Sequence, residues 1–149
     1  MALTVRVRVQ GEDEVLRALD KLPADAQAAM RERAKDIAKS LAEFIRADGR
    51  AHSRQGARAA RSVSESSVGV WPVITADNSS RMLFGSVFGM KRHSGWYNKR
   101  RYRNSRGMQY SPYIGYPGYW FFSSAEKRQP WIESEWHKAA DDVVRRWSA

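Results

Sequence analysis

The sequence predicts an α+β fold in which a small, mostly antiparallel sheet packs on a long central helix. Three patterns indicate this fold: a period-two alternation at residues 3–10, a period of three to four over residues 24–48, and a second such period from about residue 129. With 149 residues, 42% of them hydrophobic, the chain is long enough for one domain with its own core. We therefore expect a single domain over residues 1–149, with an extended loop or arm at about 90–119.

The first predicted elements are a strand and a short helix. Polar side chains alternate with Leu3, Val5, Val7 and Val9, as in a half-buried strand. Gly11 ends this pattern, and the segment EDEVLRALDKL then has a helical apolar face formed by Val15, Leu16, Leu19 and Leu22. Pro23 ends that helix or begins the next one.

The central helix has the strongest pattern in the chain. Its apolar face comprises Ala26, Met30, Ala34, Ile37, Leu41 and Ile45. Gly49 stands where a C-terminal cap is expected. A helix over residues 24–48 would be roughly 37 Å long.

The second half of the chain is predicted to be less regular. Residues 53–63 form a basic loop or short helical turn, and Val68, Val70 and the segment WPVITAD form two short strands, with Pro72 at an edge, a bulge or the turn between them. Residues 79–90 fit a strand or a helix. Residues 90–119 have no amphipathic period, which indicates a long loop. A C-terminal helix follows from about Gln129, with Pro130 in its first turn.

Positive charge is concentrated in the middle of the chain. Residues 49–124 contain twelve Lys and Arg against Glu65 and Asp77 alone, and they account for the entire net charge of +10. Such a localised field usually faces a polyanion or an acidic partner. The candidate contacts for DNA or an acidic partner are Arg92, Lys99, Arg100, Arg101, Arg103 and Arg106.

Aromatic side chains lie between these cations, so three interpretations remain open. Arginine and aromatic rings together suit nucleic acid, they suit protein interfaces equally well, and they also occur in solvated basic loops. A second basic set comprises Arg46, Arg50, Arg54, Arg58 and Arg61. A helix that continued past Gly49 would align the first four in one row, but the two glycines, Gly49 and Gly56, argue against it, so a solvated loop is expected.

The segment MQYSPYIGYPGYWFF repeats tyrosine at every third position. A constant step of three indicates an extended chain or a string of turns rather than a helix or a strand. Pro112 and Pro117 restrict its backbone, and tyrosines provide contact area with few rotatable bonds. The strip could be a stacking platform for nucleic-acid bases or an arm that anchors on another protein. Because it contains no positive charge, we favour the arm, with Tyr110, Tyr113, Tyr116, Tyr119 and Trp120 as its anchors.

The sequence offers little catalytic chemistry. It has no cysteine and none of the common nucleophile or phosphate-binding motifs. Glu133 and His137 are four residues apart, but without further ligands nearby a surface pair is the better interpretation than a metal site. No apolar run is long enough to span a membrane, and there is no signal-peptide core. We expect a non-enzyme without cofactor or metal, made in the cytoplasm.

Taken in order, these elements resemble the small tail-component proteins of siphophages, called tail-completion or head–tail joining proteins. The resemblance rests on SRQGARAARSV, through Arg54, Gly56 and the Ser62–Val63 step into a strand, and on MLFGSVFG, through Phe84 and Gly85. The acidic residue that usually precedes the FG pair is replaced by Leu83, and the insertion at 90–119 is longer than expected.

The resemblance implies a structural virion protein at the head–tail junction or in the tail. Such a protein forms a ring, often of six subunits, between the capsid connector and the tail tube, and contacts other neck and tail proteins and the DNA that passes through the lumen. The alternative function is that of a sequence-nonspecific DNA-binding protein, whose cationic middle segment follows the phosphates.

Overall fold

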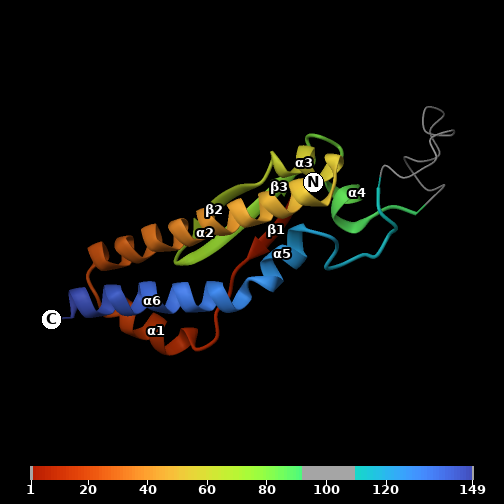
Figure 1. Cartoon of the computed structure of the whole chain (residues 1–149). Coiled ribbons are helices and arrows are strands. Elements are labelled where there is room, and N and C mark those ends of the chain that lie inside the picture. The colour runs from red at the N-terminus through yellow and green to blue at the C-terminus, as the bar shows by residue number, and fades with distance from the viewer. Residues whose placement is uncertain (1, 92–109, 149) are drawn as a thin grey trace. The chain divides into compact units, whose positions relative to one another are not determined.

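A computed structural model describes residues 2–91 and 110–148 and divides the chain into two compact units. Unit 1 comprises Met1–Leu3, Phe44–Val63 and Ala76–Glu126, and unit 2 comprises Thr4–Glu43, Ser64–Thr75 and Lys127–Ala149. The described residues form three strands and six helices, so the predicted α+β class with a small sheet is confirmed (Figure 1). None of these helices is long and apolar enough to cross a membrane.

The sheet has the order β1-β3-β2 and lies mostly in unit 2. Its strands are β1 (Ala2–Arg6), β2 (Ser64–Val68) and β3 (Trp71–Asp77). β2 and β3 form an antiparallel hairpin whose turn contains Gly69 at a φ of 61°. A positive φ at this position favours glycine in the turn.

Pro72 lies within the central strand, and not at an edge, a bulge or the turn as the sequence suggested. It is paired with Ser67 on β2, and its carbonyl accepts a hydrogen bond of 3.1 Å from the Val7 N–H. The proline therefore removes one donor from the sheet but keeps its acceptor, which makes a central position tolerable.

The helices of unit 2 are α1 (Glu12–Asp20), the first part of α2 (Ala24–His52) and α6 (Gln129–Trp147). α1 packs on α6. The Trp136 ring stacks on Trp71 at 4.9 Å, and its indole Nε1 donates to the Val70 carbonyl at 2.9 Å. The core of this unit is supplied mainly by Leu19, Ala26, Met30, Ala34, Ile37, Leu41, Val73, Ile74, Ile132, Trp136, Ala139, Ala140 and Val143.

Unit 1 contains the last turns of α2 and three short helices, α3 (Arg54–Ala60), α4 (Leu83–Phe88) and α5 (Phe121–Lys127). α3 packs on α4. The core of unit 1 includes Ile45, Ala59, Ala60, Val63, Leu83, Val87, Trp120, Phe121 and Ala125. The ambiguity at residues 79–90 is thus resolved as a helix, whereas α5 was not predicted.

The central helix was predicted to end at Gly49, and that boundary is wrong. α2 continues to His52 and spans 29 residues. A β-carbon at Gly49 would lie 2.9 Å from the Trp120 ring and 3.1 Å from the Ala60 side chain, so this glycine provides space for close packing inside the helix. The helix gives way to α3 only at Ser53, whose side chain accepts from the Gly56 N–H and caps α3.

Candidate interaction surfaces

The tyrosine-rich segment is held against the end of α4 by backbone hydrogen bonds. The Met90 N–H donates to Ser111 O at 3.0 Å, and the Ile114 N–H donates to Phe88 O at 2.8 Å. The Tyr119 N–H also donates to Val87 O, at 2.6 Å. At Gly89 a β-carbon would lie only 2.1 Å from the Pro112 carbonyl oxygen, so the chain passes too close for any side chain there. Residues 110–119 are therefore attached to unit 1 along most of their length.

This attachment divides the five predicted anchor residues into interior and exterior positions. Tyr110 and Trp120 are buried, with exposures of 6% and 1%. The Trp120 Nε1 donates to the buried Ser86 hydroxyl at 3.3 Å. These two side chains belong to the core of unit 1, so the expectation that they contact a partner does not hold for them.

Tyr119 is half-buried and supports the segment from within unit 1. Its ring stacks on His52 with centroids 4.7 Å apart, and its hydroxyl donates to Pro112 O at 2.7 Å. Burial lowers the pKa of His52 below its ordinary value.

Three neighbouring side chains of the segment are left exposed. Tyr113 and Ile114 are each 55% exposed, and Tyr116 is 68% exposed. The Tyr116 hydroxyl donates to Glu126 Oε1 at 2.9 Å, and this hydrogen bond raises the pKa of Tyr116. We call these three residues, Tyr113, Ile114 and Tyr116, the aromatic ridge.

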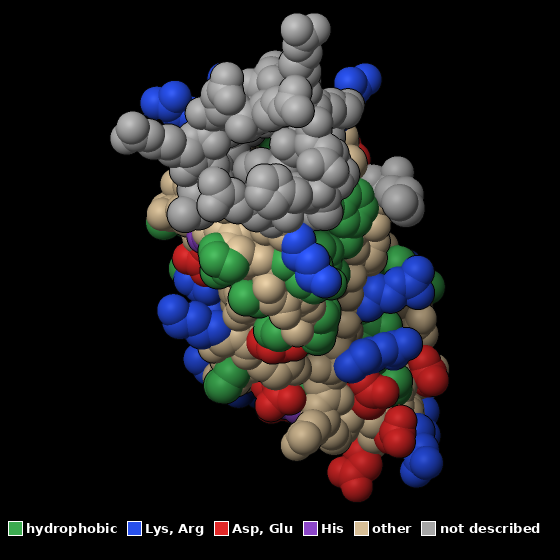
Figure 2. Space-filling model, turned by 90° about the vertical axis from the view of Figure 1, so that its right-hand side faces the viewer, with side chains coloured by type: hydrophobic (Ala, Val, Ile, Leu, Met, Phe, Trp, Pro, Cys, Tyr) green, Lys and Arg blue, Asp and Glu red, His purple; other side chains and the backbone are tan. Residues whose placement is uncertain are grey.

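Half-buried phenylalanines extend the aromatic ridge along unit 1. The ring of Tyr116 lies 5.1 Å from Phe122, which lies 6.0 Å from Phe88, and Phe88 lies 6.4 Å from Phe84. A cavity of about 390 Å³ opens between Tyr113 and α4. On the face turned to the viewer in Figure 2, hydrophobic side chains gather beside basic ones. An exposed apolar strip of this kind is typical of a surface that binds a protein.

All six predicted cationic contacts belong to the segment 92–109. Arg92, Lys99, Arg100, Arg101, Arg103 and Arg106 lie outside the described residues. The described cation next to them, Lys91, has its ammonium group 5.7 Å from the centre of the Tyr113 ring, at the edge of the aromatic ridge.

The residues that carry the family resemblance have structural roles in unit 1, apart from Arg54, which is exposed on α3. A β-carbon at Gly56 would lie 2.4 Å from the Gly49 carbonyl oxygen, and one at Gly85 would lie 2.7 Å from the Tyr110 ring. The Ser62 hydroxyl lies 2.9 Å from Asp77 O, at the start of the strand hairpin. The Phe84 ring stacks on that of Phe88, with the two ring centroids 6.4 Å apart.

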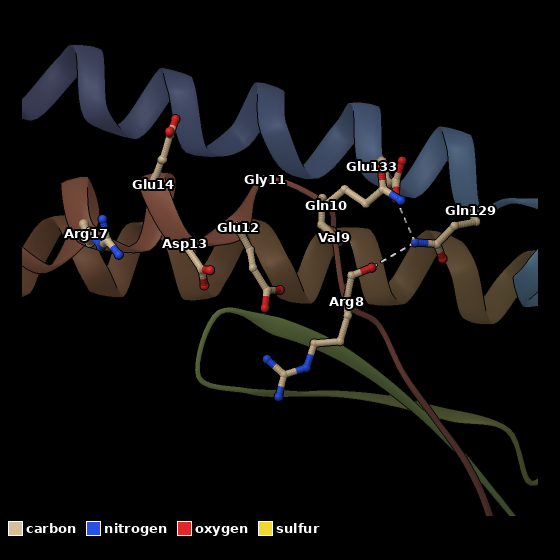
Figure 3. A pocket seen from close by; sticks show the side chains of 10 residues that line it. All are labelled: Arg8, Val9, Gln10, Gly11, Glu12, Asp13, Glu14, Arg17, Gln129 and Glu133. Carbon is tan, nitrogen blue, oxygen red and sulfur yellow. Dashed lines mark hydrogen bonds between the residues drawn. The ribbon is translucent and has the colours of Figure 1, made fainter.

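Unit 2 has a polar cleft of about 800 Å³ between α1, α6 and the segment that joins β1 to α1 (Figure 3). Carboxylates from both helices line it, namely Glu12, Asp13, Glu14 and Glu133. Gln129 bridges the two sides, because its Nε2 donates to Arg8 O at 2.8 Å and to Glu133 Oε1 at 3.4 Å. The Arg8 side chain points away from Gln129, and its guanidinium lies 5.0 Å from the centre of the Trp71 ring.

Glu133, which lines this cleft, and His137 make separate contacts. Glu133 accepts from Gln129, while the His137 Nε2 lies 2.8 Å from Gln10 O. Among residues 2–91 and 110–148, no group of three or more His, Asp or Glu side chains is arranged to hold a metal ion.

Comparison of the chain with models of known protein families, with curated proteins and with solved structures finds no match.

Proposed function

We propose that this chain is a structural virion protein of a siphophage neck or tail, which acts in tail completion or head–tail joining. In this role it forms a ring of subunits, made in the host cytoplasm, that links the capsid connector to the tail tube and performs no catalysis. The order of the elements, from the first strand through the long helix and the two motifs to the C-terminal helix, is similar to that of the tail-component family.

The observation that carries the proposal is the aromatic ridge. Tyr113, Ile114 and Tyr116 are at least half exposed, yet the backbone that bears them is hydrogen-bonded to α4. A ridge fixed in this way loses little conformational entropy when it is covered by a partner, and tyrosine is among the residues that dominate interface energies. A ring subunit needs such a surface for a neighbouring subunit or for the next ring of the neck.

The proposal is tested by complementation with a Tyr113→Ser, Tyr116→Ser double variant in a phage that lacks its own copy of this protein. The removal of two interface tyrosines, each worth on the order of 2 kcal/mol, should prevent joining and leave separate heads and tails in electron micrographs. The matched control is a Val68→Ser, Trp147→Ser variant, which removes two exposed apolar side chains from unit 2.

Wild-type yields of joined particles from the ridge variant would contradict the proposal, as would equal defects in both variants. Native mass measurement of the purified chain, alone and with its neck partners, gives the number of subunits independently.

A further inference from the structure

The exposed face of α3 is a row of arginines. Arg54 and Arg58 lie one helical turn apart, and Arg61 follows three residues later at the C-terminal cap. Side chains at such spacings share one face, with Cβ atoms about 5–6 Å apart. All three side chains are exposed. We call Arg54, Arg58 and Arg61 the arginine face.

No described acidic residue neutralises this face. None of its three arginines forms an ion pair or a side-chain hydrogen bond with a residue in the described part of the chain. The nearby Arg46 differs, because both its Nε and its Nη2 donate to Val63 O. The sequence of unit 1 contains thirteen Lys and Arg against three Asp and Glu, whereas that of unit 2 contains thirteen of each. The whole net charge of +10 therefore belongs to unit 1.

The three carboxylates of unit 1, which could neutralise the arginine face, have other partners. Asp77 accepts from the Ser79 N–H at 2.9 Å, and this hydrogen bonding, from the side chain and backbone of Ser79, lowers the pKa of Asp77. Glu126 accepts from the Tyr116 hydroxyl, and Asp48 is also engaged. The three guanidinium groups are therefore available, in the described part of the chain, to a partner that brings its own negative charge.

The composition of α3 favours phosphate over an acidic protein surface. The other residues of this helix are Gln55, Gly56, Ala57, Ala59 and Ala60, so no large apolar side chain accompanies the arginines. A protein interface normally includes such an apolar anchor. Arginine forks match phosphate oxygens, and each strand of duplex DNA presents one phosphate about every 3.4 Å of its axis.

We propose that Arg54, Arg58 and Arg61 bind the phosphate backbone of duplex DNA without regard to base sequence. The site is separate from the aromatic ridge and consists of side chains from one helix and its cap. It would bind DNA whether or not the chain joins heads to tails, so its failure would leave the proposed neck function intact.

The test measures the affinity of the full chain for a 30-base-pair duplex by fluorescence anisotropy over a range of salt concentrations. An Arg54→Gln, Arg58→Gln, Arg61→Gln variant should bind roughly tenfold more weakly or worse near 0.1 M salt. The slope of log K against log salt should become shallower by about 2 to 3, because each lost phosphate contact contributes about 0.9. The corresponding Arg→Lys variant keeps the charge and should retain most of the slope.

The matched control removes the same amount of charge from unit 2. Arg31, Lys35 and Lys39 are an exposed row at steps of four on α2, interspersed with acidic Glu32 and Asp36. Replacement of these three residues by glutamine should leave the slope of log K against log salt unchanged. A duplex of different base sequence should also give the same slope with the parent chain. The proposal is overturned if the parent chain does not bind the duplex, if the α3 variant keeps the parental slope, or if both glutamine variants lose the same amount.

Discussion

The backbone of Gly56 lies against that of Gly49, so closely that a β-carbon on Gly56 would be 2.4 Å from the Gly49 carbonyl oxygen. Gly49 in turn faces the buried ring of Trp120. The contact lies where the long helix α2 gives way to α3, the helix that bears the arginine face.

A Gly56→Ala substitution should therefore destabilise the protein even though alanine is the better helix former. Overpacking of this kind costs typically about 1–3 kcal/mol, and the obstructing atom belongs to the backbone, which cannot rotate away. The melting temperature should fall by about 2–4 °C for each kcal/mol in a chain of this size. Gln55→Ala at the adjacent position is the control and should melt at or above the parental temperature. If Gly56→Ala melted at the same temperature as the parent protein, the close contact would be refuted.

Tyr110 and Tyr113 should respond in opposite ways to the same substitution. Tyr110 is 6% exposed and covers Gly85, so Tyr110→Ser leaves a cavity and should cost about 3–5 kcal/mol of stability. Tyr113 is 55% exposed, and Tyr113→Ser should change the melting temperature little. Thermal unfolding followed by circular dichroism distinguishes them, and a large loss for Tyr113→Ser would place that ring in the core instead of in the aromatic ridge.

Arg46 should be needed for stability, in contrast to the arginines of α3. Its Nε and Nη2 lie 3.1 and 2.7 Å from the Val63 carbonyl oxygen, just before β2 begins. An Arg46→Met variant keeps much of the apolar stem but loses these charged donors, which should cost about 1.5–3 kcal/mol. Arg58→Met serves as the control, because Arg58 is exposed and should not change the melting temperature. If both variants lost the same amount of stability, the hydrogen bonds from Arg46 to Val63 O would not be what stabilises the fold.

His52 should make stability depend on pH. Burial lowers the pKa of His52 in the folded state, so the unfolded chain takes up a proton at a higher pH than the folded one. This contribution to stability is complete above the ordinary histidine pKa near 6.5. It decreases as the pH falls below that value and levels off below the folded-state pKa. The melting temperature of a His52→Phe variant should fall less than that of the parent between pH 7.5 and 5; equal decreases would show that other groups cause the effect.

The sequence was sufficient to predict the elements whose pattern is periodic. The apolar positions of α2 and α6 and the alternation around β1 reflect one-sided burial, which leaves a regular trace along the chain. The two short strands have no such period, since β2 has no buried residue and β3 buries three consecutive ones. The ends of the helices were predicted less accurately. Gly49 was interpreted as the cap that ends α2, because glycine is common at that position, whereas in the structure it lies inside α2 and makes room for the Trp120 ring. The helix α5 was not predicted, since its apolar residues follow the tyrosines without a break in composition.

Only the tertiary structure decided which tyrosines lie inside. Tyr110, Tyr113, Tyr116 and Tyr119 are equivalent by spacing, yet backbone hydrogen bonds from residues 110–119 to α4 turn the first into the core and leave Tyr113 and Tyr116 exposed. The arginine face had likewise been expected to be a solvated loop. Its side chains share a surface because residues 54–60 form the helix α3, on which positions four and three residues apart lie on one face. The composition and period of the sequence determined the class of fold and the location of the charge, because both are local properties. Contacts between residues distant in the chain determined which side chains are available to a partner.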